Sequence, residues 1–138
     1  MIEEIFKDTL KKSRLFCTRE RVRLFQELKN SHDPCSIAHL VSATAEAMDE
    51  TTVYRNLDAF EKIGIVHRVY TGWKYKVELS DMFRDHHHHM TCTTCGNIIS
   101  FEEPESLETE LKKLGQKYNF SVQSHTLELK GLCSACSN

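Results

Sequence analysis

Two pairs of cysteines have the spacing of metal ligands. Cys92 and Cys95 form one C-x-x-C pair, and Cys133 and Cys136 form a second pair after 37 intervening residues. Two such pairs complete the tetrahedral four-thiolate set of a structural zinc ion. The alternatives are a redox C-x-x-C, which would open a helix in a thioredoxin-like unit, and four unrelated buried thiols. A turn and a strand are expected after the first pair, so the sequence favours one zinc site.

A run of four histidines, residues 86–89, is the second segment rich in ligands. On a β-strand successive side chains point to opposite faces. His86 and His88 are then expected on one face, and His87 and His89 on the other. Each pair can hold a metal that prefers imidazole, such as zinc, iron, cobalt or nickel. The run therefore predicts two sites, with further ligands drawn from the candidates His32, Glu78, Glu108 and His125.

The first half of the chain must position these residues with helices and a hairpin. Helices are expected over residues 3–12, from a cap at Thr18 to about 29, from a cap at Ser36 to about 47, and from about 50 to 63. Strands are expected over residues 65–70 and 73–79, joined by a turn. Helices followed by a hairpin are typical of a winged helix.

The second half mixes strands with one helix. Strands are expected over residues 86–91, 98–101 and 120–129, and a helix begins at Pro104. The predicted fold class is α+β. An N-terminal winged-helix domain (1–79) is followed by a hinge (80–85) and a small α/β domain (86–138) that binds metal.

The charge distribution changes what the composition excludes. The formal net charge of −2 argues against nucleic-acid binding, but residues 1–79 carry 13 basic and 12 acidic side chains, whereas residues 80–138 carry 5 and 8. The segment 11–23 alone has six basic residues and one acidic residue. In the fourth helix Val53, Leu57 and Phe60 are expected in the core, which leaves polar side chains near its N-terminus exposed.

Such a helix can enter the major groove of DNA, although an exposed polar helix face is also common without a ligand. The candidate DNA contacts are Arg19, Arg21, Thr51, Thr52, Tyr54 and Arg55.

Other function classes are disfavoured. There is no run of 18 apolar residues, and the acidic amphipathic start is unlike a secretory signal, so a cytoplasmic protein with reduced thiols is expected. The ligand pattern of zinc deaminases and any nucleophile constellation are missing, so no enzyme and no small organic substrate is expected. Cys17 and Cys35 are expected to be small hydrophobic residues rather than ligands.

These motifs, in this order, resemble the ferric uptake regulator (Fur) family. The resemblance covers residues 5–136 and rests on Thr18-x-x-Arg21, the segments 52–57, 77–79 and 86–96, and the closing C-x-x-C. It implies a metal-responsive transcription regulator, mostly a repressor of metal uptake or homeostasis genes. It also implies a homodimer that binds double-stranded operator DNA through a winged helix and pairs through its C-terminal domain.

The resemblance implies roles for individual residues. Tyr54 and Arg55 match the DNA-contacting positions of the recognition helix, and the four cysteines match a structural Zn²⁺ site. His32, Glu78, His87 and His89 match a regulatory site for a divalent metal, Zn²⁺, Fe²⁺ or Mn²⁺. His86, His88, Glu108 and His125 match a second site within the dimerisation domain.

Two departures from the family pattern matter. Ser100 stands where the family often has a carboxylate that serves as a fifth regulatory ligand, which favours four-coordinate zinc and disfavours peroxide sensing. His88 stands where the family often has Asp, and His is an acceptable ligand. The alternatives to an iron-type regulator are a zinc-specific or peroxide-sensing member of the family, or a metal-buffering module that does not bind DNA.

Overall fold

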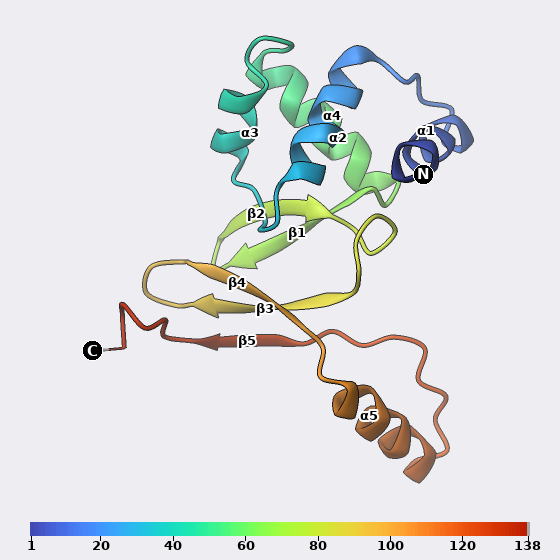
Figure 1. The fold of residues 1–138 in the computed structure, drawn as a ribbon, viewed down its shortest axis with the longest axis vertical. Helices are drawn as coiled ribbons and strands as arrows, with labels where there is room; N and C mark the ends of the chain where they lie inside the picture. Colours follow the sequence, from blue (N-terminus) through green and yellow to red (C-terminus); the bar gives the residue numbers. More distant parts are fainter. Residues whose placement is uncertain (138) are drawn as a thin grey trace. The chain divides into compact units, whose positions relative to one another are not determined.

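The computed structural model describes residues 1–137 and divides into two compact units, Met1–Asp85 and a unit that begins at His86 (Figure 1). The first contains α1 (Ile2–Lys12), α2 (Arg19–Asn30), α3 (Ile37–Ala43), α4 (Glu50–Lys62), β1 (Val66–Thr71) and β2 (Lys74–Leu79). The second contains β3 (His87–Cys92), β4 (Ile98–Glu102), α5 (Glu105–Lys117) and β5 (Glu128–Gly131). No helix among the described residues is long and apolar enough to span a membrane.

Polar caps fix where the helices of the first unit begin. The Ser36 hydroxyl accepts a hydrogen bond from the His39 backbone N–H, and Thr18 caps α2 in the same way. Such caps satisfy amides that a helix leaves unpaired at its start. Both caps were predicted from the sequence. However, α3 ends at Ala43 rather than near residue 47, because residues 44–47 close tight turns instead of a further helical turn.

Aromatic rings form the centre of the first unit. The Phe6 ring stacks on Phe25 with centroids 4.1 Å apart and meets the edge of Phe60 at 5.6 Å. Phe83 also packs on Phe25, at 5.2 Å, and is buried. The segment 80–85, predicted as a hinge, is therefore anchored on the first unit by its phenylalanine. Burial of these rings removes large apolar areas from water and stabilises the helices as one body.

The hairpin begins where α4 ends. Gly64 has φ +79°, a conformation that costs glycine little, and the Ile65 N–H bonds back to the Phe60 carbonyl. β1 and β2 pair antiparallel, and the helices lie on one side of them (Figure 1). Val66, Val77 and Leu79 belong to the core of the unit. Four helices followed by a two-stranded wing are the predicted winged-helix arrangement.

The second unit is a three-stranded sheet in the order β4-β3-β5, with β3 antiparallel to β4 and parallel to β5. β5 is much shorter than the strand predicted over residues 120–129. The reason is local, since the Phe120 N–H donates to the Gly115 carbonyl of α5 at 2.8 Å, which turns the chain back onto the helix. Strand pairing therefore starts only at Glu128.

Candidate metal centres and DNA-binding helix

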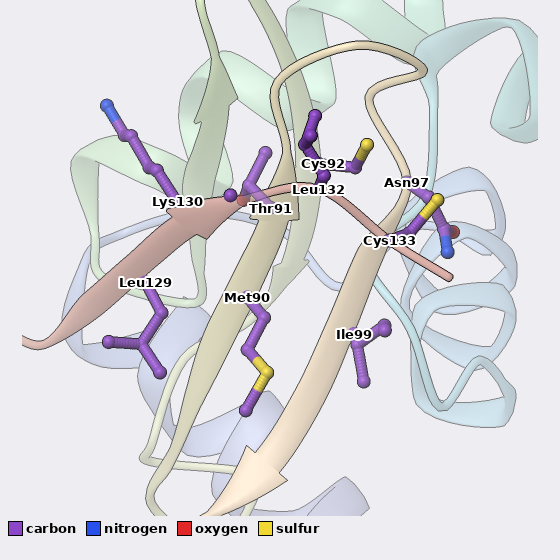
Figure 2. Close-up of a pocket in the computed structure, with 10 residues that line it drawn as sticks. Met90, Thr91, Cys92, Asn97, Ile99, Leu129, Lys130, Leu132 and Cys133 are labelled. Carbon is purple, nitrogen blue, oxygen red and sulfur yellow. The ribbon is translucent and has the colours of Figure 1, made fainter. Parts of the chain in front are cut away.

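The two C-x-x-C pairs meet because β3 and β5 are parallel neighbours. Cys92 is the last residue of β3 and lies opposite Gly131, the last residue of β5, so both pairs follow strands that end at the same edge (Figure 2). The four cysteines form one group whose sulfur atoms all lie within 4.8 Å of one another. The Thr93 N–H donates to the Gly131 carbonyl at 2.8 Å and joins the ends of β3 and β5.

The sulfur geometry fits zinc. Four Zn–S bonds of about 2.3 Å in a tetrahedron place the sulfurs about 3.8 Å apart. The Cys95 and Cys133 sulfurs lie 3.7 Å apart. A tight turn lies within each pair: the Gly96 N–H donates to the Cys92 carbonyl and the Cys136 N–H to the Cys133 carbonyl, with Gly96 at φ +74°. The four-cysteine group therefore has the donor type, number and spacing of a structural zinc site.

The thiols of this group differ in acidity. Backbone N–H groups of Cys95 and Cys133 point at the Cys92 sulfur and lower the pKa of that thiol to about 6. Hydrogen bonds with the Cys133 and Cys95 thiols raise the pKa of Cys136 to about 12. The backbone thus favours a thiolate at Cys92 near neutral pH, whereas Cys136 needs a bound cation to lose its proton.

The histidine run lies at the start of β3, with His86 just before the strand, and its side chains pair two residues apart. His86 and His88 have ring centroids 4.6 Å apart, and His87 and His89 have centroids 4.9 Å apart. The pairing of ligands predicted from the two-residue period of a strand is the pairing found. His88 and His89 are both buried.

His86 and His88 are part of a second compact group, together with His125 and Glu103. His88 Nε2 lies 3.4 Å from Glu103 Oε2 and 3.3 Å from His125 Nε2. His125 Nε2 lies 3.2 Å from the other Glu103 oxygen. Three imidazoles and a carboxylate around one point are a ligand set for a divalent transition metal.

The carboxylate beside these histidines is Glu103, whereas the sequence prediction named Glu108. Glu108 lies on α5 with a side chain 64% exposed, and its carboxylate pairs with Lys112 at 3.3 Å. Glu103 directly follows β4, and its side chain is only 14% exposed. The β3–β4 register pairs His88 with Phe101, so two residues further on Glu103 falls on the same face opposite His86. Strand register was the signal that could have identified it.

In the first unit, the predicted regulatory ligand Glu78 is a buried carboxylate, 1% exposed. It accepts from Arg84 Nη1 at 3.4 Å and lies 2.8 Å from His67 Nε2. This contact with Glu78 raises the pKa of His67. Arg84 also donates to the backbone carbonyl of His32, whose side chain is exposed. Sequence reasoning named Glu78 and His32 but missed His67 and Arg84, which cross-strand and loop contacts bring to Glu78.

In the second unit, Ser100 lies directly opposite His89 in the β3–β4 register. This is the position at which the sequence departs from the Fur pattern. The Ser100 hydroxyl is buried without a hydrogen-bond partner among the described residues. A serine hydroxyl is a weak metal ligand compared with a carboxylate, so the His87–His89 face offers imidazoles alone at this point.

The N-terminal half of α4 presents polar side chains to solvent. Asp49 caps the helix by accepting from the Thr52 N–H at 2.8 Å, and hydrogen bonds from Thr52 lower the pKa of Asp49. Val53, Leu57 and Phe60 are buried as predicted, whereas Thr51, Tyr54 and Arg55 are exposed and Thr52 is half-buried. This surface has the side chains and the helix terminus that suit a DNA groove.

The two predicted DNA contacts on α2 have different surroundings. Arg19 is exposed. Arg21 is half-buried, and its guanidinium donates to the side chain of Asn56, in α4, at 3.2 Å and to the Phe16 carbonyl at 2.6 Å. Asn56 is itself buried. Arg21 therefore positions α4 against α2, a role that its basic type did not reveal.

The remaining cysteines stand apart from these groups. Cys17 is exposed, and Cys35 is buried with its sulfur near the Asp33 carbonyl. Burial raises the pKa of the Cys35 thiol. The sequence predicted small buried or loop residues at both positions, and Cys35 is buried while Cys17 lies exposed in the loop before α2.

Known proteins resemble this chain in sequence and in fold. The model of the ferric uptake regulator family matches residues 12–130. The chain belongs to the ferric uptake regulator family. It is therefore a metal-responsive, DNA-binding transcription regulator, as the metal-ligand groups and the winged helix indicate.

Individual relatives support this membership. The chain is 32% identical over 143 residues to the ferric uptake regulation protein of Campylobacter upsaliensis, covering 98% of this chain and 88% of the relative. The solved ferric uptake regulator of Vibrio cholerae is 30% identical, with a TM-score of 0.72 over 92% of this chain and 98% of that one. The regulator from Helicobacter pylori, which has three functional metal-binding sites, shares the fold at 23% identity, with a TM-score of 0.84 over 100% and 95% of the two chains.

Proposed function

We propose that this Fur-family regulator is a homodimeric repressor of metal uptake or homeostasis genes that binds operator DNA when a regulatory metal is bound. The observation that carries the proposal is the division of ligands on β3, with one histidine pair on each face and a complete four-cysteine group at the strand end. Residues in or next to β3 thus contribute ligands to three candidate sites. Since the regulator acts on DNA, we place it in the cytoplasm.

The four cysteines would hold a structural Zn²⁺. Bound there, the ion supplies charge neutralisation for the thiolates and a rigid link between two strand ends. Cys92 and Cys95 belong to the β3–β4 turn, and Cys133 and Cys136 follow β5. The four residues would therefore keep β5 in place beside β3.

The regulatory site would join the two units. His87 and His89 offer one face of β3, and Glu78 and His32 come from the first unit. Glu78 is a buried carboxylate that lies 2.8 Å from His67 Nε2 and accepts from Arg84 Nη1, so a metal bound there would compete with the arginine for its oxygens. Ligands from both units would restrict their relative motion, which favours one spacing of the winged helices. Ser100, in place of a carboxylate, supports zinc over peroxide-sensing iron chemistry.

The second site would use His86, His88, His125 and Glu103. The first two histidines and Glu103 precede α5 in the sequence, in or next to β3 and β4. His125 follows α5 and precedes β5. A cation held by them would fix the path of the chain around that helix. This site lies within one unit, so its role is structural support of the dimerisation domain rather than closure between units.

The second unit has an apolar sheet face that supports dimerisation. Met90 pairs with Ile99 on one side and Leu129 on the other, and these three side chains are 40–48% exposed. They line a pocket of about 160 Å³ with Leu132 (Figure 2). Contiguous exposed apolar side chains mark protein interfaces. We infer that a second copy of the chain would cover this face, and a dimer formed so would place two recognition helices on successive half-sites of DNA.

The test is DNA binding by the full chain with zinc, iron(II) or manganese(II), measured by mobility shift on duplexes selected from a random library. We expect the wild type to bind only with metal. Combined His32→Ala and His89→Ala substitutions should abolish metal-dependent DNA binding. His39→Ala should leave it unchanged, because His39 is an exposed histidine that contacts Glu27. Unchanged metal-dependent binding by the double variant would contradict the regulatory site.

The DNA-binding surface has its own test. Tyr54→Ala and Arg55→Ala should each weaken binding of the metal-loaded protein without changing its metal content. If the metal-loaded wild type shifts no duplex, a metal-buffering role replaces the proposed one.

A further inference from the structure

The segment 80–85, which ends the first unit, is attached to that unit in two different ways. The Ser80 hydroxyl donates to the Gly64 carbonyl at 2.6 Å, and the Phe83 ring is buried among the aromatic rings of the core. Arg84, the next residue, is attached through hydrogen bonds of its guanidinium. The segment is therefore anchored by apolar packing at Phe83, and by a cation at Arg84 that a different cation can replace.

The guanidinium of Arg84 contacts both residues of the first unit that we propose as regulatory ligands. Its Nη1 donates to Glu78 Oε2 at 3.4 Å, and its Nη2 donates to the backbone carbonyl of His32. The Glu78 side chain is 1% exposed and that of Arg84 is 20% exposed. A buried carboxylate needs a positive partner to offset the loss of hydration. Arg84 thus supplies positive charge at the carboxylate that a metal would also use.

The loop that carries His32 is also fixed beside Glu78 by the backbone. Cys35 and Val77 exchange two backbone hydrogen bonds, at 2.7 and 2.8 Å, and Val77 directly precedes Glu78 in β2. The contact from Arg84 is a second attachment of the same loop, three residues before Cys35. Because the backbone attachment does not involve the guanidinium, the two ligands stay near each other when Arg84 leaves.

We propose that Arg84 competes with the regulatory metal for the ligands of the first unit, and that this competition sets the metal concentration to which the regulator responds. A divalent ion carries more charge than a guanidinium and bonds directly to a carboxylate oxygen, whereas 3.4 Å is a long contact for a charged pair. The ion therefore displaces the arginine, which detaches the end of segment 80–85 while Phe83 stays in the core. This inference rests on the proposed function, since it concerns ligands of the proposed regulatory site.

NMR of arginine side chains observes the exchange directly. A guanidinium fixed by hydrogen bonds rotates slowly about its Cζ–Nη bonds and gives separate Nη signals. We expect such signals from Arg84 in protein that holds zinc only at the four-cysteine site, and their loss as further zinc is added. Comparison with Arg84→Lys assigns them. Arg23 is the matched control, because its guanidinium also contacts carboxylates and a backbone carbonyl, and its signals should not change.

Unfolding measurements give the size of the exchange. Arg84→Gln should reduce the folding equilibrium constant of the first unit about two- to fivefold more in protein without the regulatory zinc than in zinc-saturated protein, because linkage equates this difference with the gain in metal affinity. The second metal site is the same in variant and wild type, so its contribution cancels. Arg23→Gln should reduce the constant by the same factor in both forms.

The outcomes separate this inference from the proposed function. Arg84 signals that persist at zinc saturation, or equal losses of stability in both forms of Arg84→Gln, would make the arginine a structural support and overturn the inference alone. A larger loss in the zinc-saturated form would also overturn it, because Arg84 would then align the ligands instead of competing for them. If Glu78→Gln leaves zinc affinity and metal-dependent DNA binding unchanged, Glu78 is not a ligand, and the proposed regulatory site fails together with the inference.

Discussion

The first unit buries phenylalanine rings against one another, whereas the second buries cysteine and histidine side chains. Among described residues 86–137, the buried side chains are polar or metal-ligating except for Ile98. A small unit without an apolar core needs other sources of stability, such as bound metal or a partner chain. The comparison teaches that one unit folds by burying apolar surface, while the other buries little apolar surface and instead brings groups of metal ligands together.

The largest expected effect is loss of the four-cysteine site. Cys133→Ser should release the structural zinc and unfold the second unit, because binding at such sites contributes on the order of 10–16 kcal/mol of apparent folding free energy. Amide NMR signals from residues 86–137 should lose dispersion while those of the first unit persist. Cys17→Ser, at an exposed cysteine outside every ligand group, is the control. An ordered second unit in zinc-free protein would remove the contrast between the two units.

The next effect concerns the apolar core. Phe25→Ala removes a ring packed between Phe6 and Phe83 and should lower the free energy of unfolding of the first unit by about 3–5 kcal/mol. Urea unfolding with and without metal measures this loss. Phe16→Ala should change stability by less than about 0.5 kcal/mol, since that ring is 84% exposed. A loss at Phe25 that added zinc reverses would show that metal also supports the first unit.

A smaller effect distinguishes the two candidate carboxylates of the second site. Glu103→Gln should weaken metal binding there by at least about tenfold, whereas Glu108→Gln should leave it unchanged, because its carboxylate contacts Lys112 on the surface. Metal titration of protein that retains its four-cysteine zinc measures the difference. The reverse ranking would mean that α5 moves toward the histidines when metal binds.

The smallest expected effect lies at Glu78. Arg84→Gln removes a cation that competes with metal for this buried carboxylate, and we expect regulatory metal affinity to rise about two- to fivefold, because the 3.4 Å contact is a long one for an ion pair. Competition with a chromophoric chelator measures the change, and Arg84→Lys, which keeps the charge, is the control. Weaker metal binding in Arg84→Gln would instead make the arginine a support that aligns Glu78.

Much of the winged helix could be predicted because its signals are local. The caps at Thr18 and Ser36, the stop at Gly64 and the spacing of Val53, Leu57 and Phe60 each depend on neighbours within a turn or two. The strand predicted over residues 120–129 was too long, since pairing begins only at Glu128. At its predicted start, the Phe120 N–H instead donates to the Gly115 carbonyl at the end of α5, a contact that periodicity does not reveal.

The sequence by itself determined which residue types can bind metal and how the histidines divide, because cysteine spacing and the two-residue period of a strand require no distant contact. Only the tertiary structure decided that Glu103 rather than Glu108 joins the histidines, and that Arg21 supports α4 instead of standing free. Those choices depend on strand register and on side chains far apart in the chain. A carboxylate or a guanidinium has the same chemistry in any position, so its surroundings determine its role.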